Sequence, residues 1–291
     1  MNESSISTSF VDDEELFKSL KKKPLVAVPT VSLLIICDTT IAVVWYLALT
    51  DQISLWLGCL INTIAMYYLF SPMHDAMHQA VSSKSSVNNL VLALTTFPIA
   101  PFTTGQFMRM MHMQHHRFAN GELDPDHEVA KNITNAFSKW FIWGHLYRSF
   151  YAKNKQHYPD FDKNLLNYDR IVGLIGLVVL FIAFPAETLL LMFIPGVLFS
   201  WLIAFVFMYL PHRPHNVEHA NDPYRATLIR EGWEWLLCPL MAYQNYHLVH
   251  HLYPTVPFYR YKKVWEARKN FHMSKNPAIV SAFQLDPVEN R

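Results

Sequence analysis

The sequence predicts an all-α integral membrane protein with four transmembrane helices and a cytosolic histidine-rich cap. Three observations lead to this fold class. Of the 291 residues, 52% are hydrophobic and only 16% are charged, whereas charged residues make up roughly 25% of typical soluble domains. Four long apolar stretches contain no lysine or arginine. The fifteen histidines all lie outside those stretches.

The first pair of predicted spans follows a polar N-terminal segment. One apolar stretch runs from Leu25 to Leu49 and the next from Ile53 to Phe70. As helices they would be about 37 Å and about 27 Å long, close to the hydrocarbon thickness of about 30 Å. We therefore expect two antiparallel spans joined by a tight turn. Residues 1–24 lack the pattern of a signal peptide and are predicted to be a cytosolic tail.

The second pair of predicted spans covers Ile171–Phe184 and Thr188–Leu210. The first of these is short, about 21 Å as a helix, so the distribution of positive charge decides the interpretation. All 24 Lys and Arg residues lie outside the four stretches: four in 1–24, ten in 71–170 and ten in 211–291. The positive-inside rule then places both termini and the middle segment in the cytosol. Asp38, inside the first span, is either functional or paired with a neighbouring polar group.

The remaining segments complete a single membrane-embedded domain over residues 25–265, followed by a cytosolic tail over 266–291. Val87–Phe107 is apolar but broken by two prolines, and we expect it to be an interfacial or re-entrant segment. Phe137–Tyr151 and Ile229–Tyr243 mix aromatic and charged residues, which is typical of helices lying in the membrane interface.

Eleven of the fifteen histidines fall into four clusters within the predicted cytosolic segments. Spacings of three and four residues place imidazoles on one face of a helix, where they can converge on a metal ion. Two HxxHH motifs in a chain of this composition would arise by chance roughly once in a thousand sequences. His127, His145, His157 and His272 are isolated and are better explained as ordinary core or interface residues. The clusters are HDAMH (74–78), HMQHH (112–116), HRPH (212–215) with nearby His219, and HLVHH (247–251).

The number of clustered histidines indicates two metal ions, because a catalytic zinc site uses only three protein ligands. An all-nitrogen pair of sites beside apolar spans points to redox iron that acts with O₂ on a lipid. The three cysteines have no CxxC spacing and no nucleotide-binding motif occurs, so electrons must come from a separate protein. The net charge of +1 gives no field to attract nucleic acid.

The three boxes HDAMH, HMQHH and NYHLVHHLYPTVP resemble, in order, those of the membrane-bound fatty-acid desaturase/hydroxylase superfamily. The resemblance implies a di-iron centre, and it extends from about residue 60 to residue 265. His212, directly after the fourth span, resembles the additional ligand between the second and third boxes; His215 competes for that role, and we favour His212. The implied iron ligands are His74, His78, His112, His115, His116, His212, His247, His250 and His251.

Within the superfamily, HMQHHRFANGELDPDH and YLPHRPH are most similar to carotenoid β-ring hydroxylases and their ketolase relatives. This resemblance implies ring hydroxylation of a β-carotene-type substrate, with a donor such as ferredoxin. Fatty-acyl desaturation or hydroxylation is the alternative. A histidine-rich metal transporter is an alternative of another class, although its spans would offer only Asp38 as an ionisable group along the path.

Four further polar residues are candidates for supporting the centre. Asp124 and Asp126 either accept hydrogen bonds from ligand imidazoles or form an ordinary Asp-Pro-Asp turn. Asp75 has the same two interpretations, and we favour contact with a ligand. Asn245 is a weaker candidate for holding a water on iron.

Overall fold

The computed structural model describes residues 11–101, 103–139, 143–161 and 163–287. Most of these residues are helical, as predicted, but a two-stranded parallel sheet corrects the all-α prediction. The elements are α1 (Glu14–Lys21), α2 (Val28–Leu49), α3 (Leu55–Met77), α4 (Ser85–Ile99), α5 (Gly105–Phe118), α6 (His127–Ala130), α7 (Ile133–Ser138), α8 (Trp143–Asn154), η2 (Lys155–His157), α9 (Lys163–Ala183), α10 (Pro185–Thr188), η3 (Leu189–Phe193), α11 (Ile194–Ile203), η4 (Ala204–Tyr209), α12 (Leu210–His212), β1 (Leu228–Glu231), α13 (Glu234–Leu240), η5 (Gln244–Tyr246), α14 (His247–Leu252), η6 (Phe258–Arg260), α15 (Tyr261–Ala267), α16 (Lys269–Met273) and β2 (Ala278–Ser281).

The helices α2 and α3 form the predicted N-terminal hairpin. They contain 22 and 23 residues, so each is roughly 33 to 35 Å long and can cross a hydrocarbon core of about 30 Å. Asp51 adopts a φ of 55° in the connecting turn. Ser54 then begins α3 by accepting a hydrogen bond from the backbone N–H of Leu57, which satisfies one unpaired donor of the first turn.

The third long apolar helix is continuous from Pro185 to His212 and passes through α10, η3, α11, η4 and α12. Its η3 and η4 segments are π-helical turns. Among the described residues, three helices are long and apolar enough to cross a membrane. The third predicted span, Ile171–Phe184, lies mostly in the shorter apolar part of α9.

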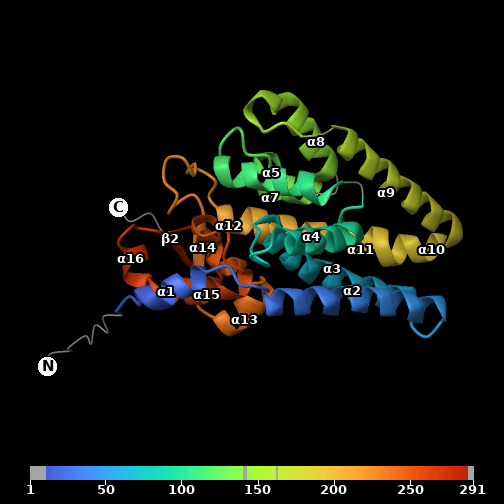
Figure 1. The fold of residues 1–291 in the computed structure, drawn as a ribbon, viewed down its shortest axis with the longest axis horizontal. Helices are drawn as coiled ribbons and strands as arrows, with labels where there is room; N and C mark the ends of the chain where they lie inside the picture. The colour runs from blue at the N-terminus through green and yellow to red at the C-terminus, as the bar shows by residue number, and fades with distance from the viewer. Residues whose placement is uncertain (1–10, 102, 140–142, 162, 288–291) are drawn as a thin grey trace.

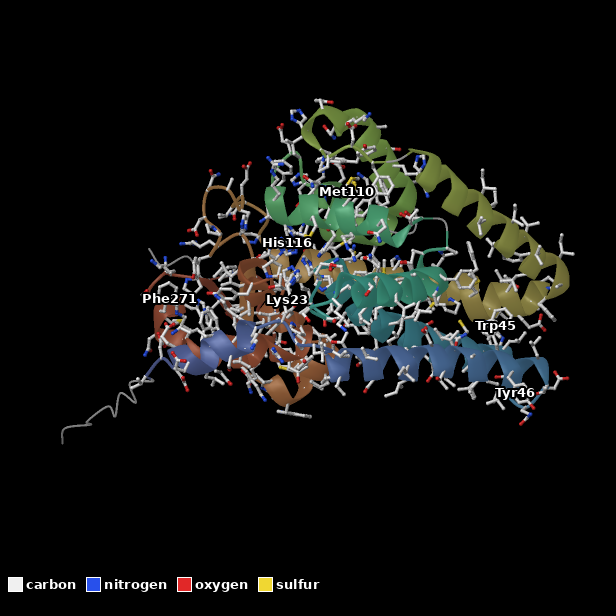
Figure 2. The ribbon with its side chains drawn as sticks, viewed as in Figure 1. Lys23, Trp45, Tyr46, Met110, His116 and Phe271 are labelled. Carbon is white, nitrogen blue, oxygen red and sulfur yellow. The ribbon has the colours of Figure 1, made fainter. Side chains whose placement is uncertain are left out.

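The helix α3 lies at the centre of the bundle and contacts α2, α4, α5, α11 and η3. Figure 1 shows the turn between α2 and α3 at the same end of the molecule as α10, while α1 and α16 lie at the opposite end. Trp45 and Tyr46 mark the first end in Figure 2, and Phe271 marks the second. This arrangement separates an apolar end of the bundle from an end that carries the shorter polar elements.

The segment Val87–Phe107, predicted to be interfacial or re-entrant, contains most of α4 and the start of α5. Thr104 begins α5 by accepting a hydrogen bond from the backbone N–H of Phe107. A Cβ on Gly105 would lie only 2.5 Å from Cγ of Leu92 in α4. Glycine therefore permits α5 to cross close to α4, and this crossing carries the α5 histidines toward the end of α3.

The prediction of one interfacial helix over Ile229–Tyr243 is wrong. The first residues form β1, which pairs in parallel with β2 in the register Leu228↔Ala278, and α13 begins only at Glu234. Arg230 in β1 is buried, and its guanidinium donates to the backbone carbonyls of Ser281 and Ala282. Of the other predicted interfacial helix, 140–142 lie outside the described residues and the flanking parts belong to α7 and α8.

Candidate metal centre

All nine predicted histidine ligands lie close together in the interior. They come from four elements that are far apart in the chain: the end of α3, α5, α12 and α14. The i, i+3 and i, i+4 spacings keep the imidazoles of each element on one helical face. Figure 2 shows His116 in the middle of the molecule. His112 is half-buried, and the other eight are buried from solvent.

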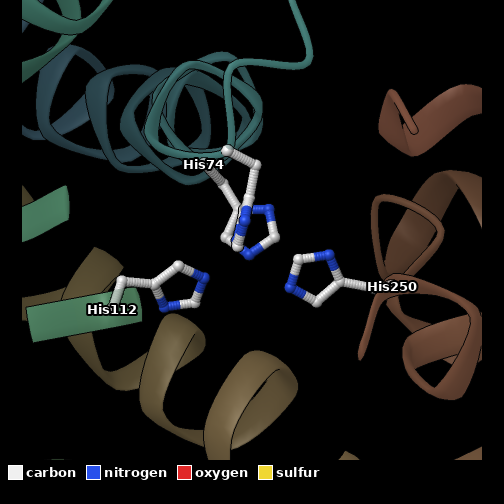
Figure 3. Close-up of side chains that lie close together, drawn as sticks. His74, His112 and His250 are labelled. Atoms are coloured by element: carbon white, nitrogen blue, oxygen red, sulfur yellow. The ribbon is translucent and has the colours of Figure 1, made fainter. Parts of the chain in front are cut away.

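One group combines four histidines from three elements: His74, His78, His112 and His250. One nitrogen from each lies within 4.8 Å of the others. The ring centroids of His74 and His250 are 4.3 Å apart, and those of His78 and His112 are 4.7 Å apart. Figure 3 shows His74, His112 and His250 directed toward a common space from three sides.

The second group combines His115, His212, His247 and His251, again with one nitrogen each within 4.8 Å of the others. Nε2 of His247 lies 3.0 Å from Nε2 of His212 and 3.1 Å from Nε2 of His251. Two donors at right angles to each other around one ion, each about 2.1 Å from it, are roughly 3.0 Å apart. The nitrogens therefore have the spacing of ligands around one ion.

His116 lies between the two groups. Its Nε2 is 2.8 Å from Nε2 of His250 in the first group. Its ring stacks on His251 of the second group, with centroids 4.1 Å apart. The two groups are thus adjacent, and the nine imidazoles form one continuous cluster.

Four of the nine imidazoles have a polar partner on the nitrogen that faces away from the group. Nδ1 of His115 lies 2.9 Å from Oδ1 of Asp124. Partners of this kind fix the tautomer and the ring orientation, and they leave Nε2 available to a metal. The other three pairs are His212 Nδ1 with Asn120 Oδ1 at 3.2 Å, His247 Nδ1 with Gln244 Oε1 at 2.5 Å, and His250 Nδ1 with the Tyr261 hydroxyl at 2.9 Å.

The DPD segment contacts His115 and also forms a turn. Asp124 and Asp126 flank His115, with Oδ2 of Asp126 3.5 Å from Nδ1. Asp124 also accepts hydrogen bonds from the backbone N–H groups of Asn120 and Asp126, so it shapes the turn as well. Burial lowers the pKa of His115, but the two carboxylates outweigh that effect and raise it to about 9.

The donor set suits metal ions on physical grounds. Nδ1 of His74, Nε2 of His78 and Nε2 of His112 are buried without a hydrogen-bond partner, an arrangement that is costly unless something else occupies the space. Burial and the neighbouring imidazoles hold the pKa of His112 and His250 well below the usual range. Neutral imidazoles offer lone pairs to borderline metals such as iron, zinc and copper.

Other predicted residues take different positions. His215 is not part of either group; its ring stacks on His212 with centroids 6.2 Å apart, whereas His212 itself belongs to the second group. Among the described residues, no hydrogen bond or ion pair is found between the Asp75 carboxylate and a histidine. It accepts hydrogen bonds from Thr30 and from the backbone N–H of Phe258, and so joins α2 and α3 to η6.

The remaining candidates are dispersed. The amide nitrogen of Asn245 lies 3.3 Å from the carbonyl oxygen of Arg230, and its oxygen is buried without a partner. Asp38 lines a largely apolar cavity of about 500 Å³ between α2, α3, α4, α9 and η3. His272 stacks on Trp265 at 5.2 Å, which is an ordinary core role. None of the histidine groups found among the described residues includes His127, His145 or His157.

Sequence reasoning missed three of the polar partners: Asn120, Gln244 and Tyr261. Gln244 precedes His247 by three residues, so helical spacing could have indicated it. Asn120 and Tyr261 meet their histidines only through the tertiary fold, and no local pattern marks them.

A small cavity of about 20 Å³ adjoins both groups. Its walls include imidazoles of each group, such as His112 and His247, and apolar side chains such as Phe70 and Phe207. The cavity therefore brings imidazoles of both groups next to apolar side chains.

Two kinds of comparison relate the chain to known proteins. The family model described as fatty acid desaturase matches residues 52–280. The β-carotene ketolase of Paracoccus sp. (strain N81106 / MBIC 01143) is 30% identical over 201 residues, which cover 66% of this chain and 71% of the relative. The β-carotene ketolase of Paracoccus sp. (strain PC1) is 30% identical over 200 residues, with the same coverage. The chain is thus a membrane oxidoreductase of lipids and belongs to the fatty acid desaturase family.

Proposed function

We propose that this chain uses a di-iron centre and O₂ to hydroxylate a β-carotene-type ring. The observation that carries the proposal is the pair of adjacent buried imidazole groups, each with four nitrogens within 4.8 Å. Iron held there would supply the activation of O₂ that oxidation of an unactivated C–H bond requires. The proposed ligands are His74, His78, His112, His115, His116, His212, His247, His250 and His251.

The side chains around the centre have three tasks. Asp124, Gln244 and Tyr261 hold ligand rings in place through the second nitrogen, which strengthens the ligands. Phe70 and Phe207 cover the membrane-helix side of the cavity, keep water out and offer an apolar surface to the substrate. Because the sequence has no nucleotide-binding motif, the electrons come from a separate protein such as ferredoxin.

A carotenoid is the preferred substrate because both relatives carry β-carotene in their names. A fatty-acyl chain is the second candidate, since the family model carries that name. Both are long apolar molecules that reach the site from the membrane. The metal-transporter alternative is not favoured by membership in an oxidoreductase family.

We also propose the membrane arrangement. Four spans, with α9 as the third, would place the α2–α3 turn and α10 outside and the histidine groups in the cytosol with both termini. The common location of the two turns at one end of the bundle supports this orientation. Residues 25–265 would form the membrane-embedded domain between the cytosolic segments 1–24 and 266–291.

The experiment is co-expression with β-carotene synthesis and a ferredoxin reductant, followed by separation of pigments and metal analysis of the purified protein. We expect oxygenated carotenoids and close to two irons per chain. A His115→Ala variant should give neither, while His145→Ala should match the wild type. If β-carotene stays unchanged while the fatty acids of the host gain double bonds or hydroxyl groups, the substrate is a fatty-acyl chain and not a carotenoid. If the protein binds iron but no lipid is oxidised, the proposed activity is wrong.

A further inference from the structure

We propose that the guanidinium of Arg109 makes the two metal sites electrostatically unequal, so that the first electron goes to the ion of the first histidine group. This inference rests on the di-iron centre of the proposed function. Arg109 is not a ligand in it. It is a positioning residue whose fixed charge sets the order in which the two ions are reduced.

Arg109 lies in α5 and is held where three helices meet. One of its terminal nitrogens donates a hydrogen bond to the backbone carbonyl of Ala76, inside the HDAMH motif at the end of α3, at 3.0 Å. The other donates at 2.9 Å to Oδ1 of Asn89 in α4 and at 2.9 Å to Oε1 of Gln106 in α5. A planar guanidinium can hold several acceptors at once. Its charge is therefore fixed at a defined place beside the first group.

The charge of Arg109 is not balanced by a carboxylate. Its three acceptors are neutral amide and peptide oxygens, and no ion pair found among the described residues includes Arg109. The one carboxylate of α3, that of Asp75, accepts instead from Thr30 and from the backbone N–H of Phe258. The Arg109 side chain is half-buried, so water and salt screen its charge only in part.

The second group has the opposite surroundings. Asp124 and Asp126 flank His115, with carboxylate oxygens 2.9 Å and 3.5 Å from its Nδ1, and each has only 2% of its surface exposed. Two pKa shifts follow the same contrast. Burial lowers the pKa of both His115 and His78; the two carboxylates then raise that of His115, whereas neighbouring imidazoles and Arg109 lower that of His78 further.

This contrast orders the reduction of the two ions. Reduction removes one positive charge from an ion, so a nearby cation favours the reduced form and a nearby carboxylate favours the oxidised form. The first electron from the external donor thus converts the ferric ion of the first group to ferrous iron, and the second electron reduces the ion of the second group. At an effective dielectric constant of about 20, unit charges roughly 10 Å apart change an equilibrium about tenfold.

The test is a stepwise reductive titration of the purified, iron-loaded protein. EPR follows the half-reduced state, because one ferric and one ferrous ion together have an odd number of electrons. We expect Arg109→Gln to shift the equilibrium of the first reduction step about tenfold toward the oxidised form, or about 59 mV. The second step should shift less than about threefold, because its ion lies beside the carboxylates instead.

Two variants separate the charge of Arg109 from its packing. Arg109→Lys keeps the charge but loses the planar fork, and its first step should stay within about twofold of the wild type. Arg117→Gln is the matched control, because it removes the same charge from the same helix at an exposed position, where solvent screens it. Equal shifts in Arg109→Gln and Arg109→Lys, or in Arg109→Gln and Arg117→Gln, would overturn the proposal. So would a second step that shifts as much as the first.

A further variant neutralises the charge without removing Arg109. Asn89→Asp keeps an acceptor oxygen for the guanidinium and places a negative charge beside it. Because Asn89 is exposed, we expect a smaller shift of about threefold, in the same direction as for Arg109→Gln. If Arg109→Gln fails to fold or to retain iron, this variant decides, and an unshifted first step in it contradicts the proposal. A wild type that binds fewer than two irons would instead overturn the proposed function.

Discussion

The Nε2 atoms of His116 and His250 lie 2.8 Å apart, although 134 residues separate the two in the chain. The contact joins α5 to α14. Two imidazole nitrogens at this distance need a shared proton or a shared cation, because two lone pairs repel each other. Burial and neighbouring imidazoles hold the pKa of His116 well below its usual range, so the ring stays neutral and can offer a lone pair to a metal ion.

His116→Ala should therefore lower the iron content of both sites, since His116 contacts His250 of one group and His251 of the other. We expect less than one iron per chain and loss of oxidised product. Metal analysis after purification measures the first, and pigment separation measures the second. The control His145→Ala lies in α8, outside the groups. Equal iron in the two variants would contradict the assignment.

His212 and His215 are distinguished by the same analysis. Nε2 of His212 faces His247 at 3.0 Å, whereas His215 lies outside both groups. His212→Ala should lose iron and activity, and His215→Ala should keep at least half of each. The reverse result would move the ninth ligand to His215.

Asp124→Asn should weaken iron binding by about 10-fold to 100-fold, the usual effect of losing a partner of a ligand imidazole. The carboxylate accepts from Nδ1 of His115 at 2.9 Å, and a neutral amide does so less strongly. The rate of iron release to a chelator measures the change. Glu128→Gln is the control, because Glu128 pairs only with the partly exposed Lys131 and Lys139 among the ion pairs seen. Similar release rates for the two variants would deny Asp124 this role.

Much of the histidine cluster was predictable because its information is local. The spacing within HMQHH and HLVHH places imidazoles on one helical face, and each motif can be recognised without knowledge of the fold. What the spacing could not show is how the histidines divide into two groups. His250 sits with α3 histidines and His251 with His212, because adjacent residues on α14 point in directions about 100° apart.

The sheet and the third predicted span were less accessible to sequence reasoning. Apolar and aromatic residues in Ile229–Tyr243 resemble an interfacial helix, but Arg230 is buried through carbonyl groups some fifty residues later in the chain. That pairing is a tertiary contact with no local signal. For Ile171–Phe184, the apolar run alone is shorter than a bilayer requires.

Gly105→Ala should lower the free energy of unfolding by about 1–3 kcal/mol, the usual cost of overpacking. Its Cβ would lie 2.5 Å from Cγ of Leu92 and 2.7 Å from Oγ1 of Thr96. These atoms are close to the backbone of α4 and cannot move far. Gly196→Ala is the matched control: it lies within α11 and a Cβ there meets nothing within 4 Å. Thermal unfolding in detergent measures both; equal melting temperatures would mean that α4 and α5 tolerate a wider separation.

Labelling of single cysteines in intact cells tests the orientation. The native Cys37, Cys59 and Cys238 are buried and would be replaced by serine. A membrane-impermeant reagent should then reach Asp51→Cys in the α2–α3 turn and Glu187→Cys in α10. It should reach Lys84→Cys and Arg225→Cys only after the membrane is opened. The reason is the positive-inside rule, since all 24 basic residues lie outside the four apolar stretches and neither turn carries one.

Lys84 and Arg225 are exposed on the protein surface, so poor labelling there reflects the membrane rather than burial. Labelling of Arg225→Cys from outside together with protection of Lys84→Cys would show an odd number of crossings between them, and α9 would then not be a span.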